Sequence, residues 1–156
     1  MKIIAVLSCL IFILFIYVCF ALMRKNPAAR TKSDSAGIIW ILAIGFLMRI
    51  IIAAAITGFS SDMGLFTYWS QKAAEDLFHI YQGDFYLDYP PFYLYILFFI
   101  GKTAGILGLN SGEALYNVLL KLPSIGADLI TAYLLYRLAR NKLPGYWPLA
   151  VAAMYV

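Results

Sequence analysis

The chain is short of charge, cysteine and histidine. Only 13% of its 156 residues are charged, whereas 63% are hydrophobic. A soluble domain has about a quarter charged residues, so this balance indicates a membrane protein. One histidine and two cysteines are too few for a zinc site built from protein side chains alone. Cys9 and Cys19 both lie in the first apolar run, where they serve as small apolar side chains.

Motifs that mark the common enzyme classes are also missing. The sequence has no Walker loop, GxGxxG, Cys/His metal cluster or Ser-His-Asp arrangement, and no internal repeat. A net charge of +4 is compatible with nucleic-acid binding. However, the basic residues occur in short segments next to apolar runs, as topology signals do. We therefore expect no nucleic-acid partner.

Long apolar runs are what the chain does have. They predict an all-α, multi-spanning membrane bundle of about four spans plus the start of another. The expected spans are residues 3–23, 36–59, 91–109 and 118–140, with a further one starting at 147. The first run exceeds the core of a signal peptide and no cleavage site follows it, so a retained span is favoured. Because the last run continues to Val156, we expect a single N-terminal membrane domain of a longer protein.

Two basic clusters give conflicting signals about topology. Residues 24–35 hold four basic residues and one acid, which places this loop in the cytoplasm and the loop 60–90 outside. Arg137, Arg140 and Lys142 form the second cluster. Strict alternation of the expected spans would put this second cluster outside, against the positive-inside rule. The topology of residues 111–142 therefore stays open, and one expected span is re-entrant or does not cross.

The outer loop, residues 60–90, is the one long polar segment. It holds five of the eight acids and the only histidine, His79, which we interpret as an interfacial polar residue. Ser60, Ser61 and Asp62 are typical of a helix N-terminus. Apolar residues then recur at steps of three and four, which predicts an amphipathic helix in the membrane interface. Pro91 suits the first turn of the next helix.

The last long helical run has its own start and break signals. Asn110 and Glu113 have the spacing of a capping box. Pro123 is expected to kink or divide the helix that follows. Residues 111–122 are interpreted as largely interfacial and residues 123–138 as membrane-embedded.

Several segments, taken together, carry a family resemblance. They are Arg49 in a span, Asp62-x3-Phe66-x2-Trp69, Phe85-Tyr86, Asp88-Tyr89-Pro90-Pro91-Phe92-Tyr93-Leu94-Tyr95 and Leu120-Lys121-Leu122-Pro123-Ser124-x3-Asp128-Leu129. Their order and spacing resemble the N-terminal part of bacterial GT-C glycosyltransferases, relatives of the dolichyl-phosphate-sugar-dependent mannosyl- and glucosyltransferases. The resemblance covers residues 49–155. The DYPP and KLPS-x3-D segments are specific only in combination.

The resemblance implies a function. In that family a sugar moves, with inversion, from a polyprenyl-phosphate carrier to a glycan, lipid or protein acceptor on the extracytoplasmic face of the plasma membrane. An outer-loop aspartate is the general base, and Asp62 matches it. Many relatives have paired acids here, whereas Asp62 stands alone. The resemblance therefore establishes no cofactor and leaves open whether a divalent metal is used. The family's later outer-loop motif would lie beyond Val156.

Each charged candidate also has a simpler interpretation. Asp62 is either the general base or a helix cap. Arg49 binds the carrier phosphate, bridges to Asp128, or extends towards the interface. Lys121 and Asp128 are interpreted as a structural charge pair.

The loop's remaining candidates divide in the same way. Asp88 either contacts the substrates or caps the helix after Pro90 and Pro91. Trp69 and Tyr89 either stack on sugar or isoprenoid, or join an interfacial aromatic belt. The belt would comprise Trp69, Tyr86, Tyr89, Tyr93 and Tyr95.

A function from another class competes with the enzyme. Only part of a catalytic pore is visible, so the chain is alternatively a non-catalytic multi-pass membrane protein, such as a transporter fragment or an assembly subunit. Both hypotheses have membrane lipids as partners.

Overall fold

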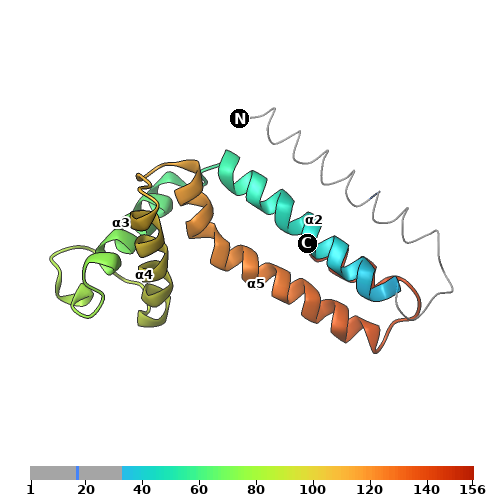
Figure 1. The fold of residues 1–156 in the computed structure, drawn as a ribbon. Coiled ribbons are helices and arrows are strands. Elements are labelled where there is room, and N and C mark those ends of the chain that lie inside the picture. Colours follow the sequence, from blue (N-terminus) through green and yellow to red (C-terminus); the bar gives the residue numbers. More distant parts are fainter. Residues whose placement is uncertain (1–16, 18–32) are drawn as a thin grey trace. The chain divides into compact units, whose positions relative to one another are not determined.

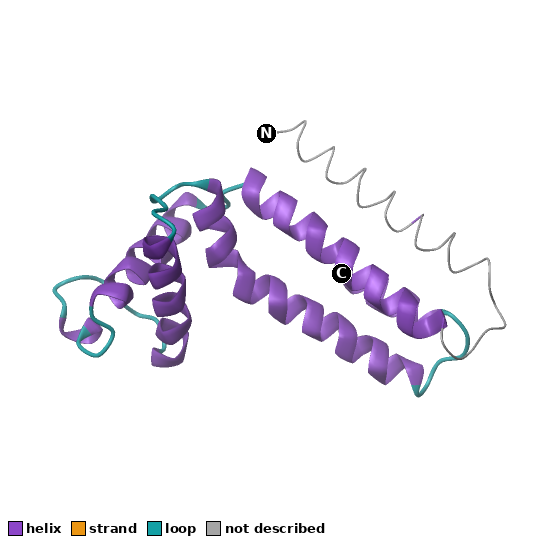
Figure 2. Ribbon diagram, viewed as in Figure 1, coloured by secondary structure: helices purple, strands orange, loops and turns teal. Residues whose placement is uncertain are grey.

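The structure, a computed structural model, describes residue 17 and residues 33–156 (Figures 1 and 2). The expected first span at 3–23, apart from Tyr17, and most of the basic loop lie outside the described residues. The elements are α2 (Ser33–Ala55), α3 (Ser60–Glu75), η1 (Ile80–Gln82), α4 (Pro91–Ile106), α5 (Ala114–Arg140) and α6 (Trp147–Tyr155). No strand occurs among the described residues, which confirms the all-α prediction.

Two helices are compatible with crossing a membrane. Residues Ala36–Ala55 of α2 and all of α5 are long and apolar enough to do so. Only 22% of the most apolar window of each helix is buried, unlike the core helix of a soluble protein. Ile39, Trp40 and Leu47 of α2 are all more than half exposed. The described chain is therefore all-helical, with two helices suited to a lipid surrounding.

Several predicted helix boundaries are confirmed and others are shifted. The helix in the outer loop begins at Ser60, and α4 begins at Pro91 as expected. The second span ends at Ala55 rather than residue 59, since Gly58 turns the chain with a left-handed φ of 91°. The expected 91–109 span ends as a helix at Ile106. Pro123 lies within one continuous helix, so it does not divide α5, and of the two predicted effects only a kink remains.

The expected helix caps differ from the observed ones. Phe59 is the N-cap of α3 and Pro90 is the N-cap of α4, and neither makes a side-chain cap hydrogen bond. Asp62 and Asp88 therefore do not cap these helices. One of the two hydrogen bonds of the capping box expected before α5 is formed. The Glu113 carboxylate accepts it from the Asn110 backbone N–H at 3.0 Å. The Asn110 side chain donates to the same oxygen at 2.7 Å, and these bonds hold the pKa of Glu113 below its usual value.

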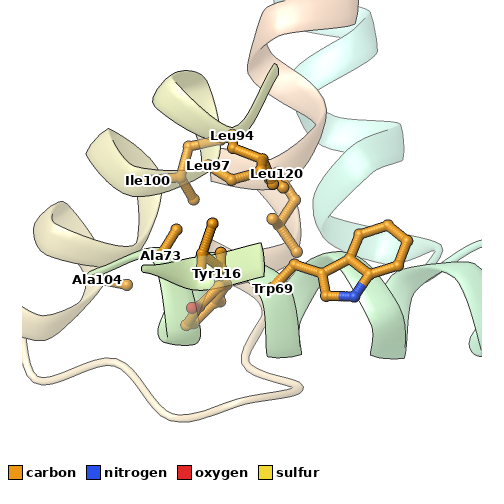
Figure 3. Packing of buried hydrophobic residues seen from close by; sticks show 9 residues of the cluster. Trp69, Ala73, Leu94, Leu97, Ile100, Ala104, Tyr116 and Leu120 are labelled. Carbon is orange, nitrogen blue, oxygen red and sulfur yellow. The ribbon is translucent and has the colours of Figure 1, made fainter. Parts of the chain in front are cut away.

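The chain forms two compact units. Among the described residues, one comprises those up to 47 together with 126–156, and the other comprises 48–125. In the described part of the first unit, Ile38, Tyr136 and Ala152 form a small buried cluster. The second unit has a larger core (Figure 3), which consists of Trp69, Ala73, Ile80, Leu94, Leu97, Ile100, Ala104, Tyr116 and Leu120. This core joins α3, η1, α4 and the start of α5.

Small residues let α3 and α4 approach closely. A Cβ atom added to Gly101 would lie 2.0 Å from the carbonyl oxygen of Ser70 and 2.9 Å from the Cβ of Ala74. The Ser70 hydroxyl is fully buried, donates to the Thr67 carbonyl oxygen at 2.7 Å and lies 2.8 Å from the Tyr116 hydroxyl. Each buried polar group at this crossing is thus hydrogen-bonded, as burial demands.

Candidate functional site

Asp62 lies in the first turn of α3, on the exposed side of the helix. Its carboxylate makes no hydrogen bond or ion pair with any residue that the structure describes. The free N–H groups of a helix N-terminus favour a negative charge at this point. Asp62, the base that the sequence predicted, is therefore an accessible carboxylate. Its one structural role is a favourable interaction with the dipole of α3.

An aromatic cluster holds the end of the outer loop against α3. The ring centroids of Trp69 and Tyr89 are 5.6 Å apart, and those of Tyr89 and Tyr93 are 4.9 Å apart. Phe66 packs edge-on against Trp69 at 5.6 Å and against Tyr89 at 5.3 Å. The structure thus brings together Trp69 and Tyr89, two of the predicted substrate-binding residues.

Two hydrogen bonds fix the backbone of this loop. The indole Nε1 of Trp69 donates to the Tyr86 carbonyl oxygen at 2.8 Å. The Tyr81 hydroxyl donates to the Tyr89 carbonyl oxygen at 2.7 Å. Trp69 is only 3% exposed, so its predicted place in an exposed aromatic belt is wrong. Tyr86 and Tyr95 remain 64% and 51% exposed and are available at the surface.

We expect Trp69→Phe to loosen the outer loop. The ring would still pack, but the Tyr86 carbonyl would lose its donor, at a cost of about 1 kcal/mol. Limited proteolysis should then cut the segment after η1 faster than in the parent protein. Trp40→Phe is the matched control, since Trp40 is 67% exposed on α2. Equal cleavage rates in both variants would contradict the anchoring role of Trp69.

Asp88 is exposed and accepts a hydrogen bond from the Tyr86 hydroxyl. This bond raises the pKa of Tyr86, with a smaller contribution from burial. Because the Trp69 bond holds the Tyr86 backbone, the position of Asp88 depends indirectly on α3. Asp88 is therefore a surface carboxylate with a defined orientation just before α4.

The ammonium group of Lys121 forms hydrogen bonds with carbonyl groups at the end of α2. Its ammonium donates to the Ala53 carbonyl oxygen at 3.3 Å and to the Ile56 carbonyl oxygen. The last carbonyl groups of a helix have no partner within the helix, and a cation is favoured there. Lys121 thus caps α2 from a distant part of the chain. Arg49 and Asp128 are half-buried on α2 and α5, and the charge pairs predicted for Asp128 stay predictions.

We expect Lys121→Met to destabilise the unit of residues 48–125. Removing the ammonium leaves two carbonyl groups without their charged donor, which costs about 1–2 kcal/mol. Thermal unfolding in detergent should report this loss. Lys102→Met is the control, because Lys102 is an exposed residue of α4 whose ammonium lies 5.7 Å from the Phe98 ring. A Lys121→Met variant as stable as the Lys102→Met variant would contradict the capping role.

Asp76 and His79 form a polar turn after α3. One carboxylate oxygen of Asp76 accepts the backbone N–H groups of Phe78 and His79, each at 3.2 Å. The other oxygen lies 2.8 Å from Nδ1 of His79. The His79 side chain is the main cause that lowers the pKa of Asp76. Sequence reasoning missed this turn, although an acid three residues before a histidine was the available signal.

The described residues hold no group of three or more His, Cys, Asp or Glu side chains that could bind a metal ion. Asp76 and His79 supply two such side chains, and Asp62 and Asp88 are not joined to them by any hydrogen bond. Residues 60–90 therefore offer separate carboxylates beside an aromatic cluster. A comparison with known protein families, with curated proteins and with solved structures finds no match.

Proposed function

We propose that this chain is part of a membrane glycosyltransferase that uses a polyprenyl-phosphate sugar at the extracytoplasmic face of the plasma membrane. One observation carries the proposal: Asp62 is an exposed carboxylate without a hydrogen-bond partner among the described residues, in the first turn of a helix that an aromatic cluster holds in place. The resemblance of the Asp62, DYPP and KLPS segments to GT-C enzymes supports it.

The proposed chemistry needs a base on the acceptor side. The Asp62 carboxylate takes the proton of an acceptor hydroxyl as the acceptor oxygen forms a bond to the anomeric carbon. The bond from that carbon to the phosphate oxygen breaks, and the phosphate leaves with the electron pair. Attack from the opposite side inverts the anomeric centre. Phosphate is a good leaving group, so no strong acid is needed.

The other candidates have supporting roles in this proposal. Arg49 provides the guanidinium for the carrier phosphate, because its planar fork suits phosphate oxygens. Asp88 and the exposed Tyr86 contact the acceptor or the sugar at the surface. Tyr89 and Trp69 shape this surface from behind through ring packing.

The test is sugar transfer in membranes from cells that express the complete reading frame. We expect membranes with the parent protein to transfer sugar from a polyprenyl-phosphate donor, and membranes with Asp62→Ala to lose transfer at an unchanged protein level. Full transfer by Asp62→Ala would reject the role of Asp62. It would favour the alternative, a non-catalytic multi-pass membrane protein.

A further inference from the structure

α4 does not fit the role of a membrane span. It has 16 residues, so it is about 24 Å long and shorter than a hydrocarbon core of roughly 30 Å. Among the described helices, only α2 and α5 are long and apolar enough to cross. The length of α4 thus conflicts with the crossing expected at residues 91–109.

α3 and α4 expose opposite kinds of side chain. The exposed residues of α3 are mostly polar: Ser60, Ser61, Asp62, Gly64, Tyr68, Gln71 and Glu75. The large exposed residues of α4 are Phe92, Tyr95, Phe99 and Ile106. These four follow one another at steps of three, four and seven. Lys102 is exposed as well and lies between Phe99 and Ile106 at the same spacing, so these five residues share one face of the helix. The pair therefore has a polar side formed by α3 and a mostly apolar side, with one lysine, formed by α4.

The contact between the helices makes a crossing costly. Gly101 lies ten residues after Pro91, about 15 Å along the helix axis. If α4 crossed from the outer surface, Gly101 would lie near the bilayer midplane, together with Ser70 and Ala74, which it touches. The neighbouring exposed ion pair of Lys72 and Glu75, with its 2.6 Å separation, would then face hydrocarbon. Charged side chains at that depth are strongly disfavoured.

The positive charges agree with a helix pair that does not cross. Residues 24–35 hold four basic residues, and Arg137, Arg140 and Lys142 follow the end of the apolar part of α5. With α2 and α5 as crossings and α4 as none, two crossings separate the clusters. Both clusters then lie on the same side, as the positive-inside rule requires. A crossing by α4 would place them on opposite sides.

The apolar side of the pair continues into a groove. A groove of about 400 Å³ lies between α4 and the first half of α5. Its lining residues are Ile96, Phe99, Ile100, Thr103, Leu119, Leu122 and Pro123. Thr103 is the one polar residue among them, and its hydroxyl donates to the Phe99 carbonyl oxygen at 2.7 Å. The groove therefore offers no unsatisfied polar side chain and suits hydrocarbon.

We propose that α3 and α4 form a pair that enters only the outer leaflet of the membrane and returns to the side from which it came. The apolar side chains on this face of α4 and in its groove contact lipid acyl chains, and Lys102 extends its ammonium towards the headgroups. The polar face of α3 lies towards water. Residues 56–113 then form one outer segment between two crossings. This topology does not depend on sugar transfer, so it can fail or hold independently of the proposed activity.

Cysteine accessibility tests the topology in the complete protein. The parent carries Cys9→Ala and Cys19→Ala, which removes both native thiols. Single cysteines are then placed at exposed positions by Asp84→Cys, Ser111→Cys and Asn141→Cys. In sealed, right-side-out vesicles, a membrane-impermeant maleimide should label the first two equally. Asn141→Cys should lose labelling until the membrane is permeabilised. Labelling of Ser111→Cys on the side opposite to Asp84→Cys, or on the same side as Asn141→Cys, would overturn the proposal.

A second pair of variants tests the lipid contact. Gln71→Cys lies on the exposed polar face of α3, and Phe99→Cys lies on the apolar face of α4, where Phe99 is 67% exposed. We expect rapid labelling of Gln71→Cys and loss of labelling at Phe99→Cys in sealed vesicles. Rapid labelling at both positions would place the α4 face in water, and protection of both would place α3 in lipid. Either result would overturn the proposed position of the pair.

Discussion

Asp62→Asn is expected to reduce sugar transfer by about 10²–10⁴-fold, the usual contribution of a general base. The amide keeps the size of the side chain but cannot take the proton of the acceptor hydroxyl. Because Asp62 makes no hydrogen bond within the described chain, the fold should lose only the dipole interaction, worth about 0.3–1 kcal/mol. Transfer rates with a saturating polyprenyl-phosphate sugar, normalised to protein level, measure the effect.

Two further variants separate the base from general charge effects. Asp84→Asn removes another exposed carboxylate of the outer loop and should leave the transfer rate unchanged. Asp62→Glu keeps a base but moves it, so its rate should lie between those of the parent and Asp62→Asn. An equal loss in Asp84→Asn and Asp62→Asn would show that the loop's charge, rather than a positioned base, matters.

Gly101→Ala is expected to destabilise the unit of residues 48–125 by about 1–3 kcal/mol, as overpacking does. Within a helix, alanine in place of glycine normally stabilises by about 0.5–1 kcal/mol. At Gly101 the new Cβ would meet the Ser70 carbonyl oxygen at 2.0 Å and the carbonyl carbon at 2.7 Å. These are backbone atoms, so no rotamer change can relieve the overlap. α3 and α4 would have to separate, which opens the core around Ala73 and Ala104.

Gly105→Ala is the matched control, one helical turn later on α4. No atom lies within 4 Å of the position that its Cβ would take, and the residue is exposed. The control should therefore unfold at the same temperature as the parent, or a higher one. Thermal unfolding in detergent and proteolysis of the loop between α3 and α4 measure both variants. A Gly101→Ala protein as stable as Gly105→Ala would contradict the close approach.

Local signals predicted the secondary structure well. The apolar runs predicted helices, Pro91 predicted the start of α4, and the basic residues near Arg140 accompany the end of α5. Such features depend on residues a few positions apart, so composition and spacing reveal them. The caps were less predictable. Ser60, Ser61 and Asp62 all have good cap chemistry, yet Phe59 occupies the N-cap, because the turn at Gly58 sets where the helix begins.

The candidate site was predicted only in part. The sequence identified Asp62, Trp69, Asp88 and Tyr89, but it could not separate the exposed carboxylates from the buried indole. An amphipathic pattern shows that Trp69 shares a face with Phe66, and both an interface belt and a packed core fit that pattern. Trp69 belongs to the core, because only 3% of it is exposed, and its indole donates to the Tyr86 carbonyl oxygen seventeen residues away.

By itself, the sequence determined an apolar, all-helical chain with one acidic and aromatic segment, because helix periodicity and hydrophobicity are local properties. The tertiary structure decided which of these residues meet. Lys121 forms a hydrogen bond with the Ala53 carbonyl oxygen at the end of α2, 68 residues away. The α3 backbone at Ser70 packs against Gly101 at a distance that leaves no room for a side chain. Such contacts depend on how distant helices pack, and many partners satisfy the same local pattern. Only the packed chain selects one of them.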